Sequence, residues 1–166
     1  MTSGLRLWAV SDLTHIGPDG TPRMVDVSAK PVTERRALAE AVVRMRPEVL
    51  ETLLAAAGPK GDALVVARLA GLNAAKRTPD LIPLAHPLPI EAMDLTFESD
   101  ETTLTIRAEV RASARTGVEM EALTAVAVAA LTIYDMTKAL QRDIVIERIR
   151  LLEKDGGESG SFRAEP

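Results

Sequence analysis

Hydrophobic residues along the first half of the chain recur with both strand and helix periods. Residues 24–27 alternate apolar and polar side chains, which predicts a short strand. Residues 34–57 carry alanine, leucine and valine at helical spacing, with Thr33 as a candidate N-cap and a break at Pro47. Residues 62–75 repeat the helical pattern after a glycine-rich loop. This half therefore predicts one strand followed by two helical stretches.

The second half begins with clear alternation. Residues 90–98 and 103–112 alternate as strands do, and the acidic pair at 100–101 suits a hairpin turn between them. A long helical pattern covers residues 117–140, and a last strand pattern covers 144–152. The resulting order, β-α(α)-β-β-α-β, predicts an α+β fold with a ferredoxin-like antiparallel sheet and helices on one face.

The two ends of the chain differ in composition from its middle. Residues 1–20 finish in a run of glycine, proline and aspartate, and residues 154–166 are rich in glycine and charge. We expect a flexible N-terminal arm over 1–20 and a flexible C-terminal tail over 154–166. The 166-residue length then leaves one catalytic domain over residues 21–153.

The long helical pattern is unusual because it is apolar nearly all round. Between Ala122 and Ile133 only Thr124 and Thr132 are polar. A surface helix shows one apolar stripe, so this helix must be covered on two sides. A single sheet covers one of them. We expect another subunit to supply the second cover, and the alternative is the earlier helices of the same chain.

The composition limits the partners, the nucleophiles and the cellular location that we expect for this chain. The net charge of −4 predicts no general attraction to nucleic acid or to an anionic membrane surface. The absence of cysteine excludes disulfides and thiolate nucleophiles. Neither a signal-peptide pattern nor an apolar run of about 20 residues is visible, so we expect a cytoplasmic protein.

Several polar residues stand at positions suited to ligand chemistry. Lys60 lies in a glycine-bounded turn before a helix, where an anion is favoured, although an exposed turn lysine is the simpler explanation. Lys76 follows a helix end and suits either capping or phosphate binding. His86 sits in an apolar loop braced by prolines and needs a partner or a ligand. One histidine without cysteine is a poor metal site, so no protein-bound metal is expected.

The ends of the long helix carry carboxylates. Glu119 follows Thr116 at capping-box spacing, which explains it without a ligand. Asp135 and Lys138 are neighbours on the helix surface, as in an ordinary exposed ion pair. Glu121 and Asp135 lie on one side of the helix, about 21 Å apart at its rise per residue. If both serve one site, they come from different chains.

Eight motifs along the chain resemble, in sequence and in order, those of the cyclic pyranopterin monophosphate synthase family, the molybdenum cofactor biosynthesis protein C. The resemblance spans about residues 13–160 and implies an enzyme with a ferredoxin-like fold. The motifs are Leu13–His15, Met24–Lys30, Lys60–Asp62, Ala74–Thr78, Leu81–Leu88, Thr116–Leu123, Leu131–Lys138 and Gly156–Gly160.

The resemblance implies a lyase of molybdenum cofactor biosynthesis. Its substrate would be (8S)-3',8-cyclo-7,8-dihydroguanosine 5'-triphosphate, and its products cyclic pyranopterin monophosphate and pyrophosphate. It also implies a homohexamer, built as a trimer of dimers with sites between subunits. The alternative class is a non-catalytic nucleotide-binding ferredoxin-like module, which would keep ligand affinity without Asp135.

Site residues carried over by motif fall into two sets. Lys60, Asp135 and Lys138 correspond to the catalytic core, as acid/base groups and as cations for the departing pyrophosphate. The family implies no resident cofactor, and any Mg²⁺ would be held mainly by the substrate triphosphate. The substrate-binding set consists of Leu84, Ala85, His86, Met120, Glu121, Glu119, Arg35 and Lys76.

Two positions depart from the family pattern. Ala85 stands where the family usually has cysteine, so the site must work without a thiol there. Glu158 stands where the family usually has lysine, so a cation at that point is not essential in this chain.

Overall fold

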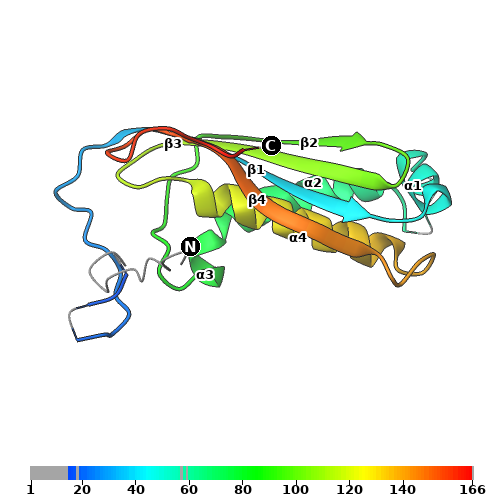
Figure 1. The fold of residues 1–166 in the computed structure, drawn as a ribbon, viewed down its shortest axis with the longest axis horizontal. Helices are drawn as coiled ribbons and strands as arrows, with labels where there is room; N and C mark the ends of the chain where they lie inside the picture. Colours follow the sequence, from blue (N-terminus) through cyan, green and yellow to red (C-terminus); the bar gives the residue numbers. More distant parts are fainter. Residues whose placement is uncertain (1–14, 18, 57, 59, 166) are drawn as a thin grey trace, which may run out of the picture.

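The computed structural model describes residues 15–165 apart from residues 18, 57 and 59. Its strands build one five-stranded sheet, and the helices lie against one face of it (Figure 1). In chain order the elements are β1 (Thr33–Arg44), α1 (Pro47–Leu54), α2 (Ala63–Lys76), α3 (Thr78–Leu81), β2 (Ala92–Ser99), β3 (Thr103–Ala114), α4 (Glu119–Thr137), β4 (Val145–Asp155) and β5 (Phe162–Arg163).

The sheet has the strand order β2-β3-β1-β4-β5, and every pairing is antiparallel. The first four strands with α2 and α4 form the split βαβ arrangement. The predicted α+β, ferredoxin-like architecture is therefore confirmed. The hairpin turn between β2 and β3 is also where it was expected, because Asp100 accepts hydrogen bonds from the backbone N–H groups of Thr102 and Thr103.

The first predicted helix is wrong over its first half, because residues 33–44 form the central strand β1. Alanine, leucine, glutamate and arginine favour helices, which concealed an alternation of period two. Ala37, Ala39, Ala41 and Val43 are fully buried and face the helices, while the residues between them face the other side of the sheet. Pairing with β3 and β4 on both sides outweighs intrinsic helix propensity here.

Two smaller predictions are also wrong. Thr33 is not an N-cap, because it starts β1, and the first helix begins only at Pro47. Residues 24–27 form no strand. The Val25 carbonyl oxygen instead lies 2.9 Å from the His86 Nε2 atom. It therefore pairs with a side chain of the loop after α3 and not with a neighbouring strand. The predicted N-terminal arm lies largely outside the described residues, since nothing is described before residue 15.

α4 packs on the sheet with one side and on α2 with another, so the same chain supplies the second cover. Close approach of α2 depends on Gly71, where a Cβ would lie 2.7 Å from Leu95 Cδ2 and 3.0 Å from the Ala125 carbonyl oxygen. Leu131 remains 58% exposed on the outer side of α4. Cover by a second subunit therefore stays a prediction that helix burial alone does not require.

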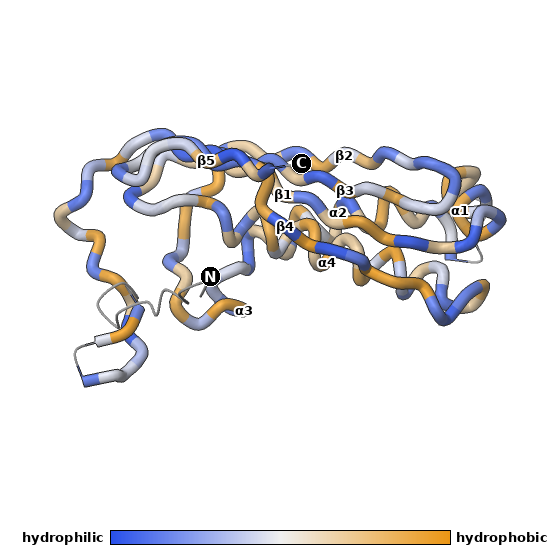
Figure 2. Tube along the Cα trace, viewed as in Figure 1, coloured by the Kyte–Doolittle hydropathy of each residue, from blue (hydrophilic) through white to orange (hydrophobic). Residues whose placement is uncertain are grey.

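By length and hydropathy α4 is the one described helix that could cross a membrane. Figure 2 shows apolar or neutral residues along most of it. More than half of its most apolar window is buried within the chain, 56%. The core position of α4 therefore accounts for its composition.

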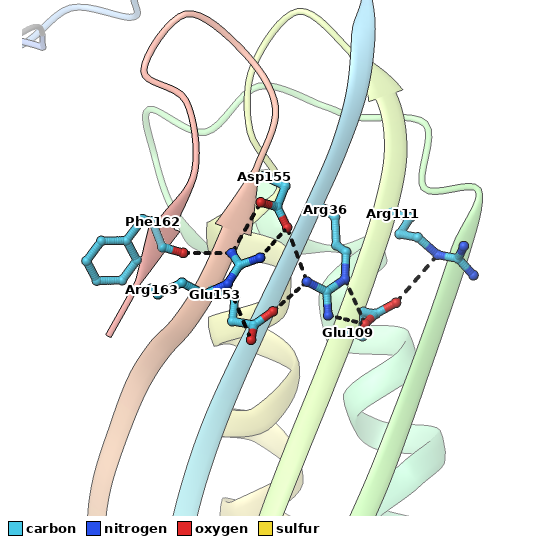
Figure 3. A network of polar contacts seen from close by, with 7 residues as sticks. All are labelled: Arg36, Glu109, Arg111, Glu153, Asp155, Phe162 and Arg163. Atoms are coloured by element: carbon cyan, nitrogen blue, oxygen red, sulfur yellow. Dashed lines mark hydrogen bonds and ion pairs between the residues drawn. The ribbon is translucent and has the colours of Figure 1, made fainter. Parts of the chain in front are cut away.

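The sheet face away from the helices carries a network of charges across four strands (Figure 3). Arg36 of β1 lies 2.6 Å from Glu109 of β3 and 2.6 Å from Glu153 of β4. Arg163 of β5 pairs with Asp155 at 3.2 Å. β4 thus runs on to Asp155, and β5 pairs with it, so part of the predicted tail belongs to the sheet.

Glu40 is the buried member of a second charge cluster on the same face. Its side chain is 3% exposed and lies 3.2 Å from Arg107 and 3.1 Å from Arg148. Arg150 approaches it at 3.5 Å. A single buried carboxylate is thus the shared ion-pair partner of three arginines that remain partly exposed, and these arginines cover it from water.

Replacing Glu40 by alanine should lower the free energy of unfolding by about 3 kcal/mol, because three arginines lose their common counter-charge. The matched control is Glu98→Ala, which also removes a partner of Arg107 but at a side chain that is 65% exposed. That change should cost less than about 1 kcal/mol. Thermal and urea unfolding at one fixed protein concentration measure both, and equal losses would contradict the role given to Glu40.

Candidate functional site

A cavity of about 750 Å³ opens at the N-terminal end of α4. Four stretches of chain that are distant in sequence form its walls. They are the segment before and into β1, the loop after α3, the start of α4 and the turn after β4. The volume is in the range of small-molecule sites.

The inward face of β1 explains why the cavity lies there. Thr33 and Arg35 are on the same side of the strand as the buried Ala37, but they lie beyond the end of the covering helix. A face that is core elsewhere thus becomes a cavity wall. The Arg35 guanidinium donates hydrogen bonds to the carbonyl oxygens of Ala114 and Arg115, each at 3.2 Å. Thr33 Oγ1 is buried there without a hydrogen-bond partner among the described residues.

Three further cations line the cavity, and none of them was predicted as a site residue from the sequence. They are Lys30, Arg115 and Lys154. Their positions on three separate segments carry no spacing signal, because only the fold brings them together. Lys30 did lie within a quoted family motif, and this was the one available sign. The cavity wall therefore holds four cations when Arg35 is counted.

The proline-braced loop places its polar group as expected. His86 Nε2 lies 2.9 Å from the Val25 carbonyl oxygen, which can only accept, so this nitrogen carries the proton. In the neutral ring the other nitrogen is a hydrogen-bond acceptor. Leu84 and Ala85 line the cavity beside His86. The loop presents one polar ring within an otherwise apolar wall.

The capping-box explanation of Glu119 is wrong. α4 begins at Glu119 itself, and its N-cap Val118 makes no side-chain hydrogen bond. The Glu119 carboxylate folds back over Gly117 instead, where a Cβ on that glycine would lie 2.7 Å from Oε1. Glu119 is one of the residues that line the cavity.

Glu121 is the buried carboxylate of the site, with only 3% of its surface exposed. Burial in the cavity floor raises the pKa of Glu121 to about 7, and the nearby Glu119 charge adds to the shift. A carboxyl group with that pKa exchanges protons near neutral pH. Among the cavity carboxylates it is the one suited to acid/base chemistry.

Lys60, Asp135 and Lys138 form a separate cluster at the opposite end of α4. Lys60 Nζ lies 2.9 Å from Asp135 Oδ2 and 2.8 Å from its carbonyl oxygen. Lys138 Nζ lies 2.7 Å from Asp135 Oδ1. The hydrogen bonds from Lys138 and then Lys60 lower the pKa of Asp135 to about 2, and the same contact raises the pKa of Lys138.

The predicted site residues thus separate into two places within one chain. Lys60, before α2, touches Asp135, near the end of α4, so the two helices run antiparallel. Lys76, at the other end of α2, is exposed and is not part of the cavity wall. The cavity brings together Arg35, Leu84, Ala85, His86, Glu119, Met120 and Glu121, whereas Lys60, Asp135 and Lys138 lie at the far end of α4.

The residues that the structure describes form no metal site, since no three histidine, aspartate or glutamate side chains converge among them.

Lys30 and Glu158 form an ion pair at 3.2 Å across the cavity edge. The glutamate that departs from the family pattern therefore lies at the cavity, where it partly neutralises one of its cations.

Comparison with known proteins gives a consistent result. The MoaC family model matches residues 24–157. A protein of Roseiflexus sp. strain RS-1 named cyclic pyranopterin monophosphate synthase is 57% identical over 155 residues, which cover 92% of this chain and 98% of that protein. Proteins with the same name from Thermomicrobium roseum and Roseiflexus castenholzii are 53% and 54% identical, cover 94% of this chain, and are themselves covered over 95% and 100% of their length.

Glu121→Gln should change how stability depends on pH. Because the pKa of Glu121 is raised to about 7, the folded protein binds more protons than the unfolded chain between about pH 4.5 and pH 7. Wild-type stability therefore falls across this window by an amount on the order of 3 kcal/mol that the glutamine variant does not lose. Unfolding free energies of both proteins between pH 4.5 and 8 test this, and parallel curves would contradict the raised pKa.

Proposed function

The chain belongs to the MoaC family, and on that premise we propose that it is a lyase of molybdenum cofactor biosynthesis. It converts the cyclised 7,8-dihydro-GTP into cyclic pyranopterin monophosphate and pyrophosphate. The carrying observation is identity of 57% to a protein named as this synthase, over 98% of that protein's length. The cavity agrees in kind, because it combines four cations with an apolar, histidine-bearing wall.

In this proposal the cations of the cavity wall bind the phosphate groups of the substrate. Arg35 is fixed by two carbonyl oxygens and presents a planar donor group suited to phosphate. Lys30, Arg115 and Lys154 add charge around it. The net charge of the whole chain is −4, so this local cluster has to supply the attraction for a triphosphate.

The heterocycle of the substrate lies against the loop and the start of α4 in this proposal. His86, Glu119 and Glu121 are polar groups there, and Leu84 and Met120 are apolar ones. Glu121 exchanges protons near neutral pH, because burial raises its pKa to about 7. It is therefore suited to move protons during the rearrangement, or to accept N–H groups of the ring.

The cluster at the far end of α4 has a different capacity. Asp135 stays ionised at neutral pH, since its pKa is lowered to about 2, and this makes it a weak base. Its role is to hold Lys60 and Lys138 as ammonium groups with fixed positions. Those ammonium groups stabilise the charge that develops on the departing pyrophosphate, and the raised pKa of Lys138 keeps that group charged.

The distance between the two sets requires more than one chain for a single site. Glu121 and Asp135 are about 21 Å apart along α4, which is too far for one small substrate. In the proposed assembly the cavity of one subunit meets the lysine cluster of another. A homohexamer arranged as a trimer of dimers provides such interfaces, with no protein partner, nucleic acid or membrane required.

The protein is placed in the cytoplasm by this proposal, where its nucleotide-derived substrate is made. It carries no resident cofactor. A Mg²⁺ ion could accompany the triphosphate, with the substrate as its main ligand.

The two departures from the family pattern fit this scheme. Ala85 lines the cavity with a methyl group, so the loop contributes its backbone and His86 rather than a thiol. Glu158 pairs with Lys30 at 3.2 Å, so it reduces the local positive charge. Arg35, Arg115 and Lys154 then carry most of the phosphate binding. A non-catalytic binding module is the less favoured alternative, given the near full-length match to named synthases.

Removal of the lysine cluster should abolish turnover without unfolding the protein. Lys60→Ala, Asp135→Asn and Lys138→Ala should each reduce pyrophosphate release from the cyclised dihydro-GTP by at least about a hundredfold, because acid/base groups and charge stabilisation contribute on this scale. These side chains are exposed, so unfolding temperatures should change little.

The matched control for that series is Asp94→Asn. Asp94 is a 70% exposed aspartate that pairs with Arg68 at 3.1 Å, and it belongs neither to the cavity wall nor to the lysine cluster. It should leave turnover unchanged. Intact substrate and no pyrophosphate from the wild-type protein would show that the lyase assignment is wrong, and full activity of Asp135→Asn would show that the cluster is not catalytic.

A further inference from the structure

Two glycines after β4 lie against Arg35 at the cavity wall. The antiparallel register pairs Arg36 with Asp155, so the chain that leaves β4 passes Arg35 at Gly156 and Gly157. Figure 3 shows Asp155 beside Arg36, where this turn begins. Both glycines have left-handed backbone angles, with φ of 94° and 78°. Such angles favour glycine over any residue with a Cβ.

A side chain at either glycine would collide with β1. A Cβ on Gly156 would overlap the Glu34 carbonyl oxygen and lie 3.3 Å from Arg35 Cδ. A Cβ on Gly157 would overlap Arg35 Nη1 and lie 2.8 Å from its Cζ. The Arg35 guanidinium therefore occupies the space that a side chain of residue 157 would fill.

This contact completes the fixation of Arg35. Nε and Nη2 already donate to the carbonyl oxygens of Ala114 and Arg115 at 3.2 Å each. Gly157 closes the guanidinium on the Nη1 side. An arginine has five N–H donors, and these two bonds leave three without a partner, of which those directed away from Gly157 are open to a ligand in the cavity. A group already held in its bound orientation loses less entropy when the ligand arrives.

We propose that Gly157 is a positioning residue, which holds the Arg35 guanidinium in the orientation that binds a phosphate group in the cavity. Gly157 acts through Arg35 and takes no part in the chemistry. The identity of the phosphorylated substrate rests on the proposed function. Binding of a phosphate anion by Arg35 does not, so the two can be tested separately.

Gly160 provides a matched control within the same turn. It also has a left-handed backbone, with φ of 65°, so alanine there brings a similar conformational cost. Among the residues that the structure describes, nothing lies within 4 Å of the position its Cβ would take. Comparison of Gly157→Ala with Gly160→Ala therefore separates displacement of Arg35 from backbone strain in the turn.

The test is binding of inorganic pyrophosphate to the full-length protein, measured by calorimetry, together with KM and kcat for the cyclised dihydro-GTP. Gly157→Ala should weaken pyrophosphate binding about tenfold, as expected for loss of a charge-assisted hydrogen bond. It should raise KM more than it lowers kcat. Gly160→Ala should change the dissociation constant less than about twofold.

A double-mutant cycle with Arg35→Ala completes the experiment. Once the guanidinium is gone, Gly157→Ala should cause no further loss of binding. Should Gly157→Ala alone fail to fold, the Arg35→Ala/Gly157→Ala double variant should fold again, because the clash has been removed.

Equal losses for the two glycine variants, additive losses in the cycle, an unfolded double variant or no pyrophosphate binding by the wild-type protein would each overturn the proposal. Pyrophosphate binding that follows the expected pattern in a protein without turnover would leave this inference standing and remove the proposed function.

Discussion

The inward face of β1 is lined by Ala37, Ala39, Ala41 and Val43, all fully buried beneath the helix layer. Their small side chains allow α4 to lie close to the sheet, and Gly71 allows α2 to lie close to α4. Burial of apolar surface between these elements is the main stabilising contribution to the fold. The charged residues of α4 are thereby confined to its two ends.

That confinement determines where chemistry can occur. At one end α4 does not extend as far as the first residues of β1. The uncovered part of the inward β1 face forms a wall of the cavity, which Arg35 and Glu121 line. At the other end Asp135 gathers two lysines in exposed positions. Each end holds groups that the other lacks, because a buried helix core cannot carry charges between them. A complete site in our account therefore combines the ends of two chains.

The sequence predicted the order of the main elements, and seven of its candidate binding residues line the cavity. Its errors have physical causes. α2 and α4 were recognisable because each has a long stretch of sequence with helical periodicity. Asp62 is also the N-cap of α2. β1 was missed because alanine and glutamate favour helices when considered alone, and only pairing on both sides makes this segment a strand. Lys154 and Arg115 were missed because their proximity results from the fold and has no counterpart in spacing.

The contribution of two chains to one site is the central claim, and mixed oligomers test it directly. Glu121→Gln and Asp135→Asn proteins would be inactive alone, then mixed under conditions in which mass measurements show subunit exchange. Random mixing should restore about one quarter of wild-type pyrophosphate release, because that fraction of sites receives an intact residue from each of its two chains. No recovery despite proven exchange would contradict the account.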